Sequence, residues 1–413
     1  MKLITLDKKE FDKFSHQNEL TSIYELSAWG DLKKKTGWYS HYVGFKDKEN
    51  IICATLLLEK RTPLKKSLFY SPRGFLLDAK NYKLLSDFTE EVKKYIKKNN
   101  GFMLKVDPNI IYKINDELIG NQEYQNYVKC GFKHFGFNEN FETLQPRILC
   151  RFNLLEDYEK TESNFQKSTR KNIHKSSNMG VVTRPIKDDE FNEFMRILGI
   201  CADKNHFIIR PNWYYETLRK LFKDEVTYYI TYIDVEKYFS YLNSELASLN
   251  KEEEELKIKL EKYNVGEKLK NEKKQLIIRK EKLTEKIKNE KERFKNKKYV
   301  YIGALMSIFL NKEGITFMSG TDPLYKDFYP KYSYYAKHIK DSIDKGEKYC
   351  NFYGISKDFN PKGKYYGIYE IKKGFNPDII ELLGEFDLVT NRFIYIIYNL
   401  ALKAYKLAKK IKH

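Results

Sequence analysis

The chain has 413 residues, enough for two compact domains, and its 41% hydrophobic and 15% aromatic content excludes general disorder. Lys and Arg number 76 against 57 Asp and Glu, and the formal charge of +19 favours nucleic acid, an anionic lipid surface or phosphorylated small molecules as partners. An AT-rich genome that favours Lys explains much of this excess equally well, so charge alone does not choose among these classes.

The first 150 residues predict mixed α/β structure, because strand-like and helical segments alternate. The opening MKLITLDKKEFDKF has no long apolar core and no small-residue cleavage site, so it indicates a strand and a helix start, not a secretion signal. Helices are expected over SIYELSAWGDLKKKTG and at about Asn81 to Lys98. Strands are expected around Tyr39 to Phe45, Ile51 to Leu58 and Ser67 to Ser71, in GFMLKVD and in LQPRILCRFNL.

A second α/β round begins near residue 151. The basic helix FQKSTRKNIHKSS precedes the strand GVVTRPI, and two helices and the strand VTYYITYI follow. Near the end, the apolar stretch Phe393 to Tyr405 is too short for a bilayer span and carries Lys403, which predicts a buried terminal helix. Peripheral contact with the inner membrane surface stays open, because anionic headgroups attract Lys and Arg.

The segment from Tyr238 to about Lys298 has a different composition, rich in Glu, Lys and Leu and without Pro, and it predicts helix. Two apolar seams with alternating spacings of three and four indicate an antiparallel coiled-coil hairpin that projects about 40 Å. The turn is expected at Asn264, Val265 and Gly266, while Glu253, Lys273 and Lys280 interrupt the seams. The seam residues are Leu242, Leu246, Leu249, Leu256, Leu260 and Tyr263, then Leu269, Leu276, Leu283, Ile287 and Phe294. A spacer, a dimerisation element and a tRNA-binding arm are all open interpretations.

Cysteines and histidines give no sign of a metal centre. The five cysteines are scattered without a CxxC pair, which favours reduced thiols in the cytoplasm, and the seven histidines form no HxxxH pair. We therefore expect no metal and no cofactor.

Several strings, in this order along the chain, carry a resemblance to the FemABX family of aminoacyltransferases. They are ELSAWGDLKKKTGW, YSPRGFLLD, VDPNIIY, ETLQPR, HFIIRPNWYY, YGISKDFNPKGKYYGIYEIKKGF and GEFDL. Each alone is a weak match, but together they span nearly the whole chain, with a helical hairpin where some members carry one. The resemblance implies two GNAT-like α/β domains: residues 1–147, completed by a C-terminal helix over 391–413, and residues 148–390, into which the helical arm 238–298 is inserted.

The resemblance also implies the reaction. Members transfer an amino acid from aminoacyl-tRNA to an amine on the stem or bridge peptide of a peptidoglycan precursor, which is either lipid II or UDP-MurNAc-pentapeptide. Both substrates are polyanions, so the basic surface would serve tRNA phosphates, the precursor diphosphate, or both. The aminoacyl-tRNA is a co-substrate, and the oligomeric state is not predicted.

The resemblance places the precursor at Lys33, Tyr112, Arg210 and Tyr214. Lys33 and Arg210 match residues that hold the diphosphate, and Pro211 puts Arg210 at a loop-to-helix junction suited to anion binding. Tyr214 lies four residues on, on the same helix face. A further family tyrosine aligns with Met318, which puts one precursor contact in doubt.

Lys372 is the expected catalytic residue. Attack of an amine on an ester creates a negative oxygen, and a fixed ammonium stabilises that transition state without a nucleophilic serine or a metal. The family has an aromatic residue where Ile371 stands here, so any stacking on tRNA from that position is lost. The basic face of Lys167, Arg170, Lys171, His174 and Lys175 is a candidate tRNA surface, and a merely solvated helix is the equal alternative.

Two rival functions remain. A GNAT-like acyltransferase on another amine, which uses acyl-CoA or attaches an amino acid to a protein terminus, would need a Gly-rich pyrophosphate turn, and neither half of the sequence contains one. A non-catalytic tRNA-binding or nucleic-acid-binding coiled-coil protein would use the same basic surface but would not need Lys372.

Overall fold

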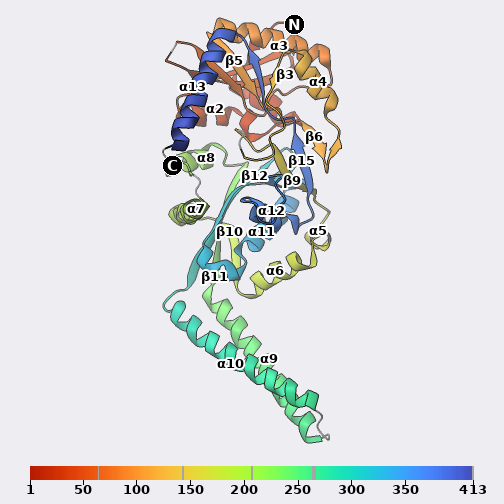
Figure 1. Ribbon diagram of the computed structural model, residues 1–413, viewed down its shortest axis with the longest axis vertical. Coiled ribbons are helices and arrows are strands. Elements are labelled where there is room, and N and C mark those ends of the chain that lie inside the picture. The colour runs from red at the N-terminus through yellow and green to blue at the C-terminus, as the bar shows by residue number, and fades with distance from the viewer. Residues whose placement is uncertain (64, 142–143, 206–207, 263–266, 412–413) are drawn as a thin grey trace.

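The computed structural model describes residues 1–63, 65–141, 144–205, 208–262 and 267–411. Two α/β lobes lie one above the other, and a pair of long helices projects from the lower one (Figure 1). Some predicted features lie outside the described residues. They are the turn of the arm at 264–266, seam residue 263, and the first two residues of ETLQPR and of HFIIRPNWYY.

The first lobe is built on a sheet of seven strands among the described residues, in the order β1-β2-β3-β4-β5-β16-β8. The β4 and β5 pair is parallel and the others are antiparallel. The strands are β1 (Ile4–Thr5), β2 (Tyr39–Asp47), β3 (Asn50–Arg61), β4 (Ser67–Ser71), β5 (Gly101–Val106), β8 (Lys133–His134) and β16 (Phe386–Val389).

Helices cover both faces of this first sheet. On one face α3 (Tyr82–Lys98) buries Leu85, Phe88, Val92 and Ile96, whose three- and four-residue spacing places them on one stripe. The expected helix over SIYELSAWGDLKKKTG is divided into η1 (Ile23–Glu25) and α2 (Ser27–Lys34), because Leu26 is extended. The remaining helices of this lobe are α1 (Lys8–Gln17), α4 (Asn121–Lys129) and α13 (Arg392–Ile411).

The second lobe contains a sheet of nine strands among the described residues, in the order β10-β11-β12-β13-β14-β9-β15-β6-β7. Its strands are β6 (Ile111–Ile114), β7 (Glu117–Leu118), β9 (Ile148–Asn153), β10 (Val181–Pro185), β11 (Val226–Asp234), β12 (Tyr299–Leu310), β13 (Glu313–Thr321), β14 (Tyr349–Gly354) and β15 (Asp378–Leu382). Its helices are α5 (Tyr158–Ser163), α6 (Lys167–Asn178), η2 (Asp188–Glu190), α7 (Phe191–Asn205), α8 (Asn212–Leu221), η3 (Pro323–Phe328), α11 (Pro330–Asp344) and α12 (Tyr366–Lys373).

The chain crosses between the lobes more than once. β6 and β7, within residues 1–147, pair with the second sheet, and β16, within residues 148–390, lies between β5 and β8 of the first. A buried ion pair between Arg147 and Glu381, 2.8 Å apart, sits where the lobes meet. The sheets therefore do not follow a single cut at residue 147, and the domain bounds stay a prediction.

The helical arm consists of α9 (Val235–Lys262) and α10 (Glu267–Arg293). Its base is anchored in the second lobe, because Tyr238, Leu242, Ile287 and Phe294 are buried there together with Phe328. Two residues that interrupt the predicted seams pair with each other, since Lys280 Nζ lies 2.6 Å from Glu253 Oε2. This contact also fixes the antiparallel register of the arm.

The predicted fold class, mixed α/β with two sheet-based units and an inserted helical arm, is confirmed. In the part of the chain that the structure describes, none of the helices has both the length and the apolar character that crossing a bilayer requires.

Candidate active site

Lys33 and Arg210 meet where α2 of the first lobe packs against α8 of the second. The Lys35 Nζ donates to Thr217 Oγ1 at 3.0 Å and joins these helices. Lys33 Nζ lies over the rings of Trp29 and Trp38, 5.8 and 5.7 Å from their centres. Burial, together with the positive charges of Arg210 and Lys60, lowers the Lys33 pKa to about 8. An ammonium that is desolvated among other cations is stabilised by a bound anion.

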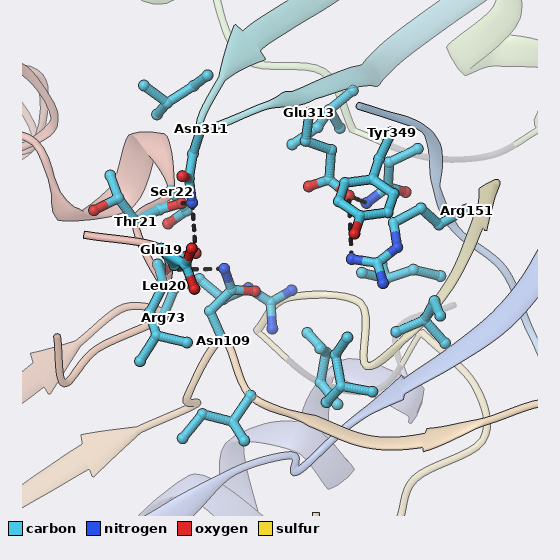
Figure 2. Close-up of a pocket in the computed structure, with 18 of the residues that line it drawn as sticks. Glu19, Leu20, Thr21, Ser22, Arg73, Asn109, Arg151, Asn311, Glu313 and Tyr349 are labelled. Carbon is cyan, nitrogen blue, oxygen red and sulfur yellow. Dashed lines mark hydrogen bonds and ion pairs between the residues drawn. The ribbon is translucent and has the colours of Figure 1, made fainter. Parts of the chain in front are cut away.

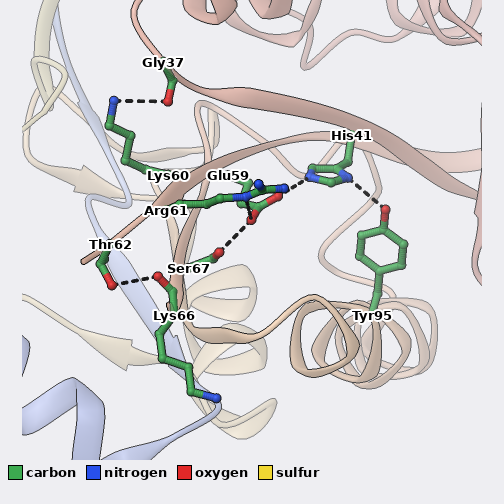
Figure 3. Close-up of polar contacts among 9 residues, drawn as sticks. All are labelled: Gly37, His41, Glu59, Lys60, Arg61, Thr62, Lys66, Ser67 and Tyr95. Carbon is green, nitrogen blue, oxygen red and sulfur yellow. Dashed lines mark hydrogen bonds and ion pairs between the residues drawn. The ribbon is translucent and has the colours of Figure 1, made fainter. Parts of the chain in front are cut away.

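Lys60 supplies the third cation of this group. Its Nζ donates to the carbonyl oxygens of Thr36 and Gly37 at 2.9 and 3.1 Å, just after α2 ends, and the Gly37 bond is visible in Figure 3. It also lies 5.8 Å from the centre of the Trp38 ring. We call Lys33, Lys60 and Arg210 the cation cluster. Three positive side chains from both lobes make a suitable site for a diphosphate.

Tyr214, Tyr215 and Met318 extend the cation cluster on its second-lobe side. The Arg210 guanidinium lies 5.9 Å from the Tyr214 ring centre, and burial raises the Tyr214 pKa to about 12 although Arg210 opposes the rise. The Tyr215 hydroxyl donates to Met318 Sδ at 3.2 Å. Where the resemblance expects a tyrosine, the chain thus presents a thioether that is held by Tyr215.

Tyr112 lies on β6 and packs in a different place. Its ring stacks on Phe137 with centres 4.5 Å apart, and Tyr124 is a further aromatic neighbour at 5.8 Å. The aromatic and cation contacts described for Tyr112 are with Phe137, Tyr124 and Lys113, so they do not bring it to the cation cluster.

Lys372 is buried near the end of α12, with only 6% of its surface exposed. Its Nζ donates to the Gly354 carbonyl oxygen at 2.8 Å. Burial lowers the Lys372 pKa to about 8; the Cys150 thiol raises it and Lys331 lowers it. The neighbouring Lys373 is exposed, so α12 turns only one of the two adjacent lysines inward.

Lys331, at the start of α11, was not predicted as a site residue. Burial is the main cause of its lowered pKa, and it acts electrostatically on Lys372. The sequence around it, FYPKYSYY, has no periodicity that separates a partly buried Lys from a solvated one. Only the packing of α11 against the second sheet brings these two ammonium groups together.

The basic helix α6 begins beside the end of α12. The backbone N–H of Gln166 donates to the Gly374 carbonyl oxygen at 2.9 Å. A Cβ at Gly374 would come within 2.1 Å of Thr169 Oγ1. A larger residue at position 374 would therefore force the Thr169 side chain to move. On α6, Lys167, Lys171 and Lys175 are exposed, and Arg170 is half-buried. Ile371 instead packs against the core of the second lobe.

A cavity of about 400 Å³ lies between the lobes, and part of its lining is drawn in Figure 2. Two arginines line it: Arg73 pairs with the buried Asp107 at 3.6 Å, and Arg151 lies 3.9 Å from Glu313 and 4.4 Å from the Tyr349 ring centre. The described residues that line it do not include the predicted site residues. Sequence reasoning missed this cavity because its walls come from distant segments that only the folded chain brings together.

The cavity and Lys372 lie on opposite faces of the second sheet. Leu149 and Arg151 line the cavity, whereas Cys150 between them faces Lys372, as the alternation of a strand requires. β13 and β14 pair with each other only over Glu313–Ile315 and Tyr349–Asn351; beyond that, among the described residues, β13 pairs only with β12, and β14 only with β9. In that region Tyr353 lines the cavity, and the next residue, Gly354, accepts the hydrogen bond from Lys372.

His41, Glu59 and Tyr95 form a second polar cluster (Figure 3). His41 Nε2 is 3.0 Å from Glu59 Oε2, its Nδ1 is 3.0 Å from the Tyr95 hydroxyl, and the Ser67 hydroxyl donates to Glu59 at 2.6 Å. Glu59 and Lys60 alternate along β3, so this cluster faces α3, away from the cation cluster. The polar side chains of this cluster form hydrogen bonds with one another, which indicates a structural role.

Comparison with known proteins gives a consistent result. A model described as the FemAB family matches residues 6–403. "Aminoacyltransferase FemA" of Staphylococcus epidermidis is 31% identical over 418 residues, which cover 97% of this chain and 98% of the relative. FemA of Staphylococcus aureus is 28% identical over 423 residues, with 98% and 99% covered. The crystal structure of FemX has a TM-score of 0.77 at 21% identity and covers 96% of this chain and 99% of its own. The chain therefore belongs to the FemAB family.

Proposed function

We propose that this FemAB-family protein transfers an amino acid from aminoacyl-tRNA to an amine of a peptidoglycan precursor whose diphosphate lies at the cation cluster. Membership of the family makes the chain an aminoacyltransferase of cross-bridge synthesis. The proposal concerns the donor, the site of each substrate and the residues that act. The observation that carries it is the buried Lys372 ammonium beside the exposed basic helix α6.

The precursor would be held across the junction of the lobes. Lys33 and Lys60 come from the first lobe and Arg210 from the second, so a bound diphosphate would neutralise mutually repelling cations and join the lobes. Tyr214 would contact the same ligand from α8. Both lipid II and UDP-MurNAc-pentapeptide carry this diphosphate, and the cation cluster does not distinguish between them.

The transfer needs no covalent enzyme intermediate. The acceptor nitrogen attacks the ester carbonyl carbon, and the carbonyl oxygen becomes negative in the tetrahedral intermediate. The Lys372 ammonium, already desolvated and oriented by the Gly354 carbonyl, stabilises that oxygen. The C–O bond to the ribose then breaks, the ribose oxygen takes up the proton that the amine releases, and the new amide remains on the precursor.

The tRNA would approach along α6. Its exposed lysines are phosphate-binding side chains, and its first turn touches the end of the helix that bears Lys372. The ester at the tRNA terminus would thereby reach Lys372 while the phosphates lie on α6. We further propose that the protein acts in the cytoplasm and reaches a lipid-linked precursor by peripheral contact with the inner membrane face.

The test is direct transfer. Purified protein is incubated with a mixture of charged tRNAs and, separately, with lipid-linked and nucleotide-linked precursor, and the products are analysed by mass spectrometry. We expect the precursor to gain the mass of one or more amino-acid residues only when charged tRNA is present. Absence of any mass gain with every charged tRNA and both precursors would refute the proposed function.

A further inference from the structure

The C-terminal helix α13 exposes an apolar stripe that its predicted role as a buried helix does not explain. Phe393, Ile396, Ile397 and Leu400 are 72, 49, 37 and 61% exposed. Their spacing of three, one and three residues places them on one face of the helix. The prediction of a buried terminal helix was therefore half wrong, because only the face with Tyr395 packs on the protein.

The charge of α13 suits a negatively charged partner. From Arg392 to the end of the chain there is no Asp or Glu, while Lys occurs at 403, 406, 409, 410 and 412. Two copies of this basic helix would repel each other, which disfavours self-association through it. An apolar stripe on a helix that exposes Lys403, has a lysine-rich sequence without acidic residues and cannot span a bilayer is the pattern of a helix that lies in the membrane interface.

The pairing of the strands places α13 on the same face of the first sheet as α2, which carries Lys33. Tyr395 of α13 packs with Met103 and Leu68. Leu68 pairs directly with Lys60 on β3, and directly opposed residues point to the same face. Lys60 belongs to the cation cluster, and the Trp29 side of α2 packs on Leu56 and Leu58 of that face.

The distance between α13 and the cation cluster is short. β3, β4 and β5 are adjacent strands, so Lys60 lies about 10 Å from the residues under α13. Figure 1 shows α13 along the outer side of the first lobe. A bilayer that contacts the stripe would therefore lie beside the site proposed for a diphosphate.

We propose that the exposed face of α13, formed by Phe393, Ile396, Ile397 and Leu400, docks in the plane of an anionic lipid bilayer. The inference rests on the proposed function for its purpose: docking would bring the cation cluster to the headgroup level, where a lipid-linked diphosphate resides. The apolar stripe supplies insertion, and the basic residues supply attraction to anionic headgroups.

Co-sedimentation with vesicles tests this docking. The probes are vesicles of phosphatidylcholine with about one third phosphatidylglycerol, and vesicles of phosphatidylcholine alone. The full chain should bind the anionic vesicles more strongly. The double substitution Phe393→Gln and Leu400→Gln should lower the partition coefficient about tenfold or more, because two inserted side chains are lost. The matched control is Leu118→Gln with Leu324→Gln, which removes side chains that are 48 and 75% exposed elsewhere.

Three results would overturn the inference: no binding by the unaltered protein, equal binding by the α13 variant, or equal loss in the control variant. A dimer in sedimentation velocity that only the α13 substitutions dissolve would also overturn it, by assigning the face to a second copy. Transfer to water-soluble nucleotide-linked precursor, without lipid, separates this inference from the proposed function. In this lipid-free assay, docking predicts equal turnover for the unaltered and α13-variant proteins. If the unaltered protein transfers to neither precursor form, the proposed function is refuted, and the vesicle result still stands.

Discussion

Replacement of Lys372 by Met should slow transfer and at the same time stabilise the fold. The two effects have one cause: the Lys372 ammonium lies in a buried environment that destabilises its charged form. Its pKa is about 8 instead of 10.5, with burial as the main cause. At about 1.4 kcal/mol per pH unit, the charged form costs the folded state roughly 3.5 kcal/mol.

The net gain in stability is smaller than this cost. Met has a similar length and no charge, but it leaves the Gly354 carbonyl oxygen without the donor that now lies 2.8 Å away. An unsatisfied buried carbonyl costs roughly 1–3 kcal/mol. We therefore expect the free energy of unfolding to rise by roughly 0.5–2.5 kcal/mol at pH 7.

The gain depends on pH with a definite sign. Between pH 8 and 10.5 the unfolded chain binds more protons at Lys372 than the folded chain does, so the stability of the unaltered protein rises with pH across this window. The advantage of the Met variant should therefore be complete below pH 8 and disappear toward pH 10.5. Denaturant titrations at several pH values measure it.

Turnover should fall by about a hundredfold or more, as removal of a group that stabilises an oxyanion commonly does. The unaltered enzyme should lose activity as pH rises through about 8, because Lys372 then loses its proton, and the variant should lack that descending limb. Lys373→Met is the matched control: it removes the exposed neighbour and should change neither property. Unchanged turnover in Lys372→Met would refute the catalytic role, and lower stability would refute the desolvation argument.

Three other changes test the rest of the site. Lys331→Met should raise the pKa of Lys372 and move the descending limb of the pH–rate profile to higher pH; a limb that does not move would remove Lys331 from the site. Arg210→Ala should raise KM for the precursor about tenfold or more with a smaller change in kcat, and an unchanged KM would place the diphosphate elsewhere. Joining residues 250 and 282 by a short Gly-containing turn should leave the melting temperature nearly unchanged, because the buried base of the arm is retained. If the shortened protein uses charged tRNA less well, the arm binds tRNA. If it loses a dimer instead, the arm serves self-association.

Periodicity and composition predicted the elements whose pattern is local. The arm is visible in the sequence because leucines repeat over many turns, and α3 because its apolar residues share one stripe. Glu253 and Lys280 appeared as defects in the seams, yet they pair across the arm, and this pairing depends on a register that a single helix does not contain.

The features that were missed depend on contacts between distant segments. β16 follows β15 closely in the chain but joins the other sheet, and the order of segments along the chain does not reveal this exchange. Lys331 and Lys372 look like many other lysines in a Lys-rich chain, and only packing shows that they are desolvated together. The stripe on α13 was predicted to be buried because apolar residues usually are, and the sequence does not show what covers a helix face.

The sites proposed for the two substrates impose a requirement on the acceptor peptide. The cation cluster lies at the contact of α2 and α8, whereas Lys372 lies on α12 under the face of the second sheet that is turned away from the cavity. A precursor held by its diphosphate must therefore extend its peptide to that face. β13 and β14 lose their pairing after Ile315 and Asn351, and Tyr353 and Gly354 follow there on β14. We expect the peptide to approach Lys372 where β13 and β14 are no longer paired with each other. Substitutions of Phe317 and Tyr353, whose ring centres are 5.2 Å apart, should therefore change the preferred length of the acceptor peptide more than the KM for the precursor.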